Sequence, residues 1–192
     1  MKEKIKDVDG IIVGIDDLSA EVLNEARNLK VVSKYGVGLD NIDLEKANNK
    51  NIIITNTPEA NIEAVADLAF TFMMSLARRI PEADRKAKEG FDGKIIGNAV
   101  WNKTLGIIGF GKIGQRVAKR AAGFNMKTLV YDVVKKEKLK NELKFNYVKF
   151  KQLLKKSDFI SLHVPLNDKT RGLIDEKNLS LMREEAFLIN TS

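Results

Sequence analysis

A glycine-rich turn directly after the apolar run 105–108 constrains this chain more than any other feature. Its glycines form the pattern G-x-G-x-x-G, at Gly109, Gly111 and Gly114. An amphipathic stretch with apolar residues at helical spacing follows the turn. Together these segments predict a buried strand, a tight turn and a helix in immediate succession.

A different physical constraint favours glycine at each of the three positions. Gly109 lets the chain turn sharply out of the strand, Gly111 has no Cβ to obstruct a pyrophosphate, and Gly114 lets the helix lie close to the sheet. The start of the helix offers free N–H groups and the positive end of the helix dipole to an anion.

An acidic residue completes the pattern. The second β-type run, 127–131, ends in Asp132, 23 residues after Gly109. An acid at about this spacing (~20 residues) meets the adenosine ribose hydroxyls in dinucleotide-binding domains. The unit therefore predicts dinucleotide binding. The alternative is a βαβ unit whose glycines serve packing alone.

The composition restricts the class of protein. The 192 residues are 44% hydrophobic and 31% charged, which is typical of a globular protein. The absence of cysteine excludes disulfides and thiolate chemistry. Because neither a signal peptide nor a bilayer-spanning run is present, we expect a cytoplasmic protein without a membrane partner. No metal site is predicted.

The net charge of +7 is confined to one segment. Residues 135–156 contain nine lysines and two glutamates, so the positive and negative charges of the remaining residues are equal in number. A nucleic-acid surface normally adds arginine and aromatic side chains to its lysines, and this segment has no arginine. Its leucines recur at helical spacing, so the prediction is a solvated helix face rather than a nucleic-acid site.

Two series of elements are expected along the chain. The first is β-α-β-α-β, ending before Pro58, with apolar strands typical of a parallel sheet covered on both faces. A long helix from Asn61 should end before Pro81, and residues 90–102 should be irregular. The second series contains the nucleotide unit, with further strands near Tyr147, at 159–164 and at 187–190.

Four stretches of the sequence resemble the D-isomer-specific 2-hydroxyacid dehydrogenases, in their phosphoglycerate dehydrogenase-like branch. They are Lys34–Asp43, Asn56–Asp67, Leu105–Gly114 with Asp132, and Ser161–Leu166 with Leu188–Ser192. The resemblance implies an α/β fold, with a Rossmann-type doubly wound parallel sheet as the NAD-binding domain and part of a flavodoxin-like substrate domain. It also implies NAD as the cofactor and a homodimer formed through the NAD-binding domain.

The same resemblance divides the chain. Residues 1–58 correspond to part of the substrate (catalytic) domain, 59–94 to an inter-domain helix and linker, and 95–192 to part of the NAD-binding domain. Both ends are expected to be cut, because the last strand has no covering helix and the first follows only a charged stub. The chain is therefore expected to be a fragment from the middle of the family's sequence.

The site residues come from the matching motifs. Val37 and Gly38 stand in the loop that binds the substrate carboxylate, although a tight turn that needs positive φ explains them equally well. Asp132 should accept ribose hydroxyls and repel a 2′-phosphate, which favours NAD over NADP, while Lys135 and Lys136 weaken that preference. The residues assigned to the cofactor are Gly109, Gly111, Lys112, Ile113, Gly114, Asp132, Val164, Pro165, Thr170, Thr191 and Ser192.

The resemblance implies hydride transfer between the nicotinamide and C2 of a small 2-hydroxy or 2-keto acid. The family's catalytic Arg, Glu and His are expected to lie outside these residues, so no catalytic residue is assigned and the chain should be inactive. His163, the only histidine, matches a His-x-Pro at a strand end rather than the catalytic His. Lys34 and Tyr35 replace the Arg and small residue of many phosphoglycerate-type members, which argues against 3-phosphoglycerate as the substrate.

Two other functions remain open on the sequence alone. One is a non-catalytic NAD-binding regulatory protein of the same fold. The other is a nucleic-acid binder that uses the lysine-rich segment. The enzyme is favoured, because a regulatory protein has no need of the Val37 and Gly38 loop.

Overall fold

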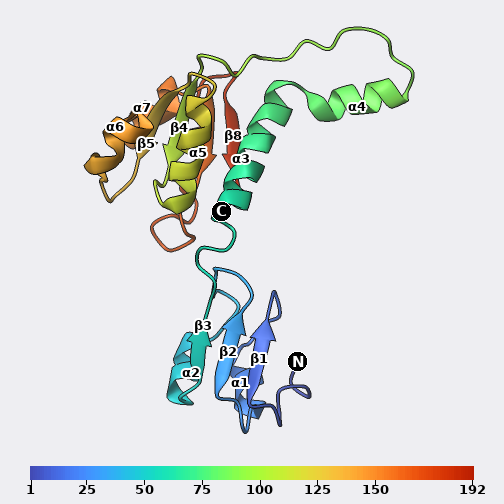
Figure 1. Cartoon of the computed structure of the whole chain (residues 1–192), viewed down its shortest axis with the longest axis vertical. Coiled ribbons are helices and arrows are strands. Elements are labelled where there is room, and N and C mark those ends of the chain that lie inside the picture. Colours follow the sequence, from blue (N-terminus) through green and yellow to red (C-terminus); the bar gives the residue numbers. More distant parts are fainter. The chain divides into compact units, whose positions relative to one another are not determined.

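The computed structural model describes all 192 residues and divides into two compact units, 1–61 and 62–192 (Figure 1). The first unit is a parallel three-stranded sheet in the order β1-β2-β3 with two helices. Its elements are β1 (Gly10–Val13), α1 (Ala20–Glu25), β2 (Val31–Lys34), α2 (Leu44–Asn49) and β3 (Ile53–Thr55). The predicted β-α-β-α-β order is confirmed.

Helices cover only one face of this sheet, so the expectation of cover on both faces is wrong for the first unit. Its strands are adjacent in chain order, and right-handed crossovers between adjacent strands place both helices on the same side. Val13 and Val32 are buried with apolar residues of α1 and α2. Ile12 and Ile53, on the opposite face, are 81% and 63% exposed.

Side chains hydrogen-bond to the unpaired backbone groups at the start of α2 and at the end of α1. Asp43 accepts a hydrogen bond of 2.8 Å from the backbone N–H of Lys46 at the start of α2, as an N-cap should. At the end of α1, the Lys50 ammonium donates to the carbonyl oxygens of Leu23 and Ala26, both at 2.7 Å. A cation at this position satisfies unpaired carbonyls and complements the helix dipole.

We predict that Lys50→Met lowers the free energy of unfolding of the first unit by about 2 kcal/mol, because hydrogen bonds to charged groups are worth roughly 1.5–3 kcal/mol. Urea unfolding, followed through the amide signals of residues 1–61, measures this loss. Lys30→Met is the matched control, since the Lys30 ammonium pairs with Asp9 at the exposed surface and such pairs are worth about 0–1 kcal/mol. Equal losses in the two variants would contradict the prediction.

The second unit is built on a parallel five-stranded sheet in the order β6-β5-β4-β7-β8. Ile108 at the end of β4 lies level with Tyr131 of β5 and Leu162 of β7. The strands are β4 (Thr104–Ile108), β5 (Lys127–Tyr131), β6 (Phe145–Tyr147), β7 (Phe159–Leu162) and β8 (Phe187–Asn190). The helices are α3 (Ile62–Ala77), α4 (Ile80–Lys88), α5 (Lys112–Ala122), η1 (Glu137–Leu139), α6 (Lys140–Leu143), α7 (Phe150–Lys156) and α8 (Glu176–Leu179).

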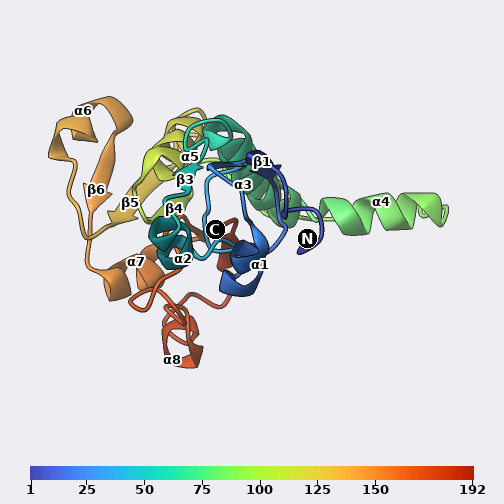
Figure 2. The same cartoon turned by 90° about the horizontal axis from the view of Figure 1, so that it is seen from below.

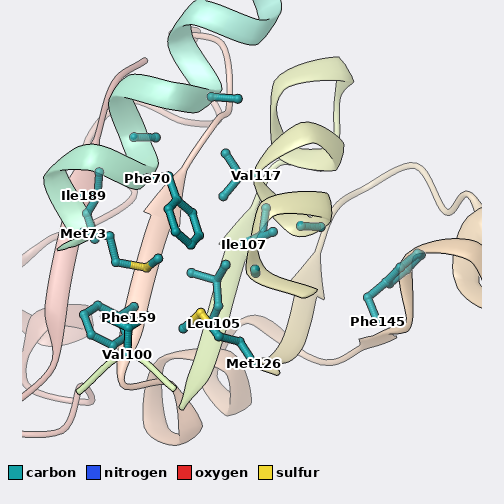
Figure 3. Close-up of a cluster of buried hydrophobic side chains, with 14 of the residues drawn as sticks. Phe70, Met73, Val100, Leu105, Ile107, Val117, Met126, Phe145, Phe159 and Ile189 are labelled. Atoms are coloured by element: carbon teal, nitrogen blue, oxygen red, sulfur yellow. The ribbon is translucent and has the colours of Figure 1, made fainter. Parts of the chain in front are cut away.

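Apolar side chains pack on both faces of this sheet. On one face, Phe70 and Met73 of α3 point toward the strands and meet Leu105 and Ile107, with Val117 of α5 beside them (Figure 3). On the other face, Leu153 and Leu154 of α7 are fully buried against the sheet. The second unit is therefore doubly wound, and the predicted Rossmann-type fold is confirmed.

The long helix expected from Asn61 is present and ends before Pro81, as predicted. It ends at Ala77, three residues short of Ile80, and Arg79 then adopts a left-handed conformation with φ of 54°. Pro81 lies in the first turn of the new helix α4, where a missing N–H breaks no hydrogen bond. Helix α4, whose first turn contains this proline, was not predicted.

Two further segments complete the second unit. Helix α4 buries no residue and projects away from the sheet in both views (Figures 1 and 2). The lysine-rich segment 135–156 is not one helix but passes through η1, α6, β6 and α7, and all its lysines except Lys136 are exposed. The predicted solvated surface is therefore correct, while the single helix is not. None of the helices combines the length and apolarity needed to cross a bilayer.

Candidate cofactor and substrate sites

The turn after β4 lies against the end of the neighbouring strand β7. Gly109 has φ of +92°, a conformation that favours glycine. A Cβ on Gly109 would stand 2.6 Å from the carbonyl oxygen of His163, so there is no room for a side chain. Strands β4 and β7 flank the point where the sheet order reverses, and open α/β sheets bind their ligands outside the carboxyl ends of the strands at this point.

The other two glycines differ in the space around them, since Gly111 is open and Gly114 is tightly packed. A Cβ on Gly111 would meet nothing within 4 Å, so the space above this residue is free. A Cβ on Gly114 would stand 2.3 Å from the carbonyl oxygen of Gly109, because α5 lies directly on the turn. Lys112 and Ile113 form the start of α5 between them. This geometry is what the glycine pattern predicts for a turn that receives a pyrophosphate.

We predict different effects for two alanine substitutions. Gly114→Ala should destabilise the second unit by roughly 1–3 kcal/mol, because overpacking forces the backbone apart. Gly111→Ala should cost less, at most about 1 kcal/mol, because Gly111 is the N-cap of α5 and alanine is a poorer N-cap, and it should weaken NAD binding. Urea unfolding and NAD titration measure the two effects. A stable Gly114→Ala protein would contradict the packing role.

The peptide group of Phe110 connects the turn to the residues after β5. Its N–H donates to one carboxylate oxygen of Asp132, and the other oxygen accepts from the N–H of Val134 at 2.8 Å. The carbonyl oxygen of Phe110 accepts from the Lys136 ammonium at 2.9 Å and from the side-chain amide of Gln115 at 3.0 Å. The acid predicted to bind ribose therefore lies directly beside the glycine-rich turn.

A second group of predicted residues lies at the ends of β7 and β8. Val164, Pro165, Thr170 and Ser192 line a cavity of about 350 Å³. The hydroxyl of Thr170 donates to the carbonyl oxygen of Pro165, which closes the loop. The Ser192 hydroxyl donates to the carbonyl oxygen of Leu162 at 2.9 Å and so links the ends of the two strands.

Thr191 contributes a polar atom without a partner. Its hydroxyl oxygen is buried and makes no hydrogen bond. Buried polar groups are normally paired, and an orphan calls for an explanation such as a bound ligand. This hydroxyl, the open space above Gly111 and the carboxylate of Asp132 fit a dinucleotide laid across the ends of the strands.

The His163 side chain contacts the strand that precedes it. Its Nε2 lies 2.8 Å from the hydroxyl of the buried Ser161. Burial lowers the pKa of His163 from 6.5 to about 4, because desolvation disfavours the imidazolium. The ring is therefore neutral at pH 7, in keeping with the structural role expected for it.

The lowered pKa of His163 predicts a pH-dependent stability. Because the unfolded state binds this proton near pH 6.5 and the folded state only near pH 4, the contribution is complete above pH 6.5 and is lost as the pH falls toward 4. Its size is up to about 3 kcal/mol. Urea unfolding between pH 4 and 7.5 should show a smaller pH dependence in His163→Asn. Identical pH profiles would refute this prediction.

The predicted substrate loop lies in the first unit. The carbonyl oxygen of Gly36 accepts from the N–H of Thr57 at 3.0 Å, and that of Val37 accepts from the side-chain amide of Asn56 at 2.9 Å. The backbone N–H groups of Val37 and Gly38 make no hydrogen bond within the protein. Both residues are exposed, so the loop presents two free donors. Free backbone N–H groups in a turn are suited to an anion.

The second unit is thus a Rossmann-type dinucleotide-binding domain by fold and by site. Residues 70–192 match the family model described as "D-isomer specific 2-hydroxyacid dehydrogenase, NAD binding domain". The chain therefore belongs to the D-isomer-specific 2-hydroxyacid dehydrogenase family of oxidoreductases, and its cofactor is NAD.

Individual relatives agree with the family. A glyoxylate reductase of Thermococcus litoralis is 46% identical over 99% of this chain and 60% of the relative. A hydroxypyruvate reductase of Thermotoga maritima is 42% identical over 98% of this chain and 61% of the relative. The chain thus spans about three-fifths of the length of the relatives that it matches.

Solved structures are similar as well. The structure of a D-lactate dehydrogenase from Aquifex aeolicus, complexed with NAD and lactic acid, has a TM-score of 0.88 at 37% identity. It is matched over 100% of this chain and 59% of its own chain.

Two contacts were missed by the sequence reading. Lys136 was expected only to weaken the preference for NAD over NADP, yet it also bonds to the glycine-rich turn. Lys34 was noted only as a departure from other sequences, yet it is buried beneath the substrate loop. Neither residue carries a sequence signal of its own, because lysine is ordinarily a surface residue.

Proposed function

We propose that this chain is part of an NAD-dependent D-2-hydroxyacid dehydrogenase, which transfers hydride between NAD and C2 of a small 2-hydroxy or 2-keto acid. The observation that carries the proposal is the glycine-rich turn bonded to Asp132 at the switch point of the sheet. Family membership supports the reaction class.

The cofactor residues have separate roles in this proposal. The free space at Gly111 and the start of α5, at Lys112 and Ile113, receive the pyrophosphate. Asp132 accepts the adenosine ribose hydroxyls, and its negative charge disfavours a 2′-phosphate. The remaining residues, Val164, Pro165, Thr170, Thr191 and Ser192, line the adenosine and nicotinamide positions. When bound, NAD supplies or accepts the hydride.

The proposed substrate is a small acid whose carboxylate is bound by the N–H groups of Val37 and Gly38. Glyoxylate and hydroxypyruvate are the leading candidates, because reductases of these two acids are among the similar relatives. We keep the proposed division into a partial substrate domain at 1–58, a connecting segment at 59–94 and a partial NAD-binding domain at 95–192. The cytoplasm is the proposed location, on the basis of the cysteine-free sequence.

A homodimer through the NAD-binding domain is part of the same proposal. Leu68, Phe72 and Leu76 recur every four residues on α3 and are each 44–45% exposed. The adjoining helix α4 buries none of its residues. A second copy of the chain is the proposed cover for this apolar stripe, since a large exposed apolar patch usually marks an interface.

The role of Asp132 is tested by cofactor titration. Asp132→Ala should weaken NAD binding by about 1.5–3 kcal/mol, the range for hydrogen bonds to charged groups, or roughly ten- to hundredfold in affinity. The preference for NAD over NADP should shrink in the same variant. Asp92→Ala removes an exposed acid outside the site and is the matched control. Unchanged NAD affinity in Asp132→Ala would contradict the assignment of Asp132 to the ribose.

For the 192-residue polypeptide itself we predict no turnover at an enzyme-like rate. Its only histidine, His163, lies against Ser161 with a lowered pKa, and general acid–base catalysis typically contributes ~10²–10⁴-fold. Mixed with NADH and glyoxylate, pyruvate, hydroxypyruvate or 3-phosphohydroxypyruvate, it should leave the NADH absorbance at background. Turnover that disappears in His163→Ala would overturn both the prediction and the structural role of this histidine.

A non-catalytic NAD-binding regulatory protein remains the second candidate, and the free N–H groups of the Val37 and Gly38 loop favour the enzyme over it. The lysine-rich segment gives no support to nucleic-acid binding, because its exposed lysines lack interleaved arginine.

A further inference from the structure

Lys34 is a buried cation without an anionic partner. It is the last residue of β2 and only 8% exposed. Its ammonium donates to the carbonyl oxygen of Gly14 and, at 2.6 Å, to the side-chain oxygen of Asn41. No carboxylate lies within 4.0 Å of it, in contrast to the exposed Lys30, which pairs with Asp9 at 2.8 Å. Lysine is almost never buried unless paired, so this position calls for a functional explanation.

The neighbours of Lys34 are neutral and hold it in place. Asn41 donates through its side-chain amide to the carbonyl oxygen of Gly14 at 3.2 Å and to that of Asp16 at 2.5 Å. Asn41 therefore has its amide oxygen directed at Lys34 and its N–H groups directed at backbone carbonyls. The two carbonyl-type acceptors orient the ammonium without neutralising its charge.

The substrate loop passes directly over this lysine. The Cε atom of Lys34, which carries the ammonium, is 3.6 Å from the position that a Cβ on Gly36 would take. The next two residues, Val37 and Gly38, carry the free backbone N–H groups. A positive charge therefore lies beside Gly36, next to the two residues whose N–H groups are proposed to bind a carboxylate.

The acid beside Gly38 does not cancel this charge. A carboxylate oxygen of Asp40 is 3.1 Å from the position that a Cβ on Gly38 would take, but Asp40 is exposed to solvent. Water and salt screen an exposed charge, whereas a buried charge acts through a medium of lower dielectric constant. The field of Lys34 thus remains favourable to an anion at the loop.

We infer that Lys34 is a positioning residue that makes the Val37 and Gly38 loop selective for anionic substrates. The inference rests on the proposed function of this loop. Lys34 acts through the backbone above it, by holding the loop over a buried positive charge. The ligand class is a small monocarboxylate, and the charge of Lys34 discriminates it from a neutral analogue.

The test is a binding measurement that needs no turnover. Glycolate is titrated into the ¹⁵N-labelled 192-residue protein, and the shifts of the Val37 and Gly38 amide signals give the affinity. Lys34→Gln keeps a donor for Gly14 but removes the charge, and it should weaken glycolate binding roughly tenfold, the effect of opposite charges several ångströms apart at intermediate dielectric. Lys34→Met, a second neutral variant, should behave alike, and Lys34→Arg should restore most of the affinity.

Lys50→Met is the matched control. Lys50 also donates to backbone carbonyls of the first unit, but at the end of α1. This variant should lose stability and keep the glycolate affinity of the wild type. If the neutral Lys34 variants weakened glycolate binding only by destabilising the first unit, then Lys50→Met, which also loses stability, would weaken glycolate binding as well.

Each outcome is decisive. If wild type binds glycolate at Val37 and Gly38 and the neutral Lys34 variants bind equally well, the inference is wrong and the proposed loop function stands. If the amides of the wild type do not respond, the proposed function of the loop is wrong and the inference falls with it. Weaker binding in the neutral variants, with recovery in Lys34→Arg, supports both.

Discussion

The close approach of the turn after β4 to the end of β7 is the contact on which the cofactor site depends. Gly109 lies so near the carbonyl group of His163 that no side chain fits between them, and α5 in turn lies on the carbonyl group of Gly109. These two contacts bring the start of α5 to the ends of the strands. The helix dipole and its free N–H groups then face the region where the strand order reverses.

The peptide group of Phe110 links the glycine-rich turn to Asp132 and Lys136 by hydrogen bonds. Asp132 accepts its N–H, while Lys136 and Gln115 donate to its carbonyl oxygen. Charges of both signs are therefore bonded to one peptide group of the turn. A strongly basic segment thus leaves a carboxylate beside the glycine-rich turn, because one lysine of that segment is engaged and the others face solvent.

The sequence predicted the elements well where a local pattern decides them. The strands of both sheets and the Asp43 cap depend on neighbours in the chain. Helix α4 was missed, because Pro81 was taken only as the end of the preceding helix and not as part of the first turn of the next one. The prediction also failed for the first sheet, whose exposed Ile12 and Ile53 look buried in the sequence.

By itself, the sequence determined the nucleotide-binding unit and the family, because glycine spacing and the acid after β5 are local signals with direct steric and electrostatic meaning. Only the tertiary structure decided that Lys34 is buried without a counter-ion, that Lys136 bonds to the turn, and that the hydroxyl of Thr191 lacks a partner. These properties depend on which atoms from distant segments surround a side chain. No pattern of neighbours along the chain encodes such an environment, because packing between segments alone decides which polar groups are screened, paired or left open.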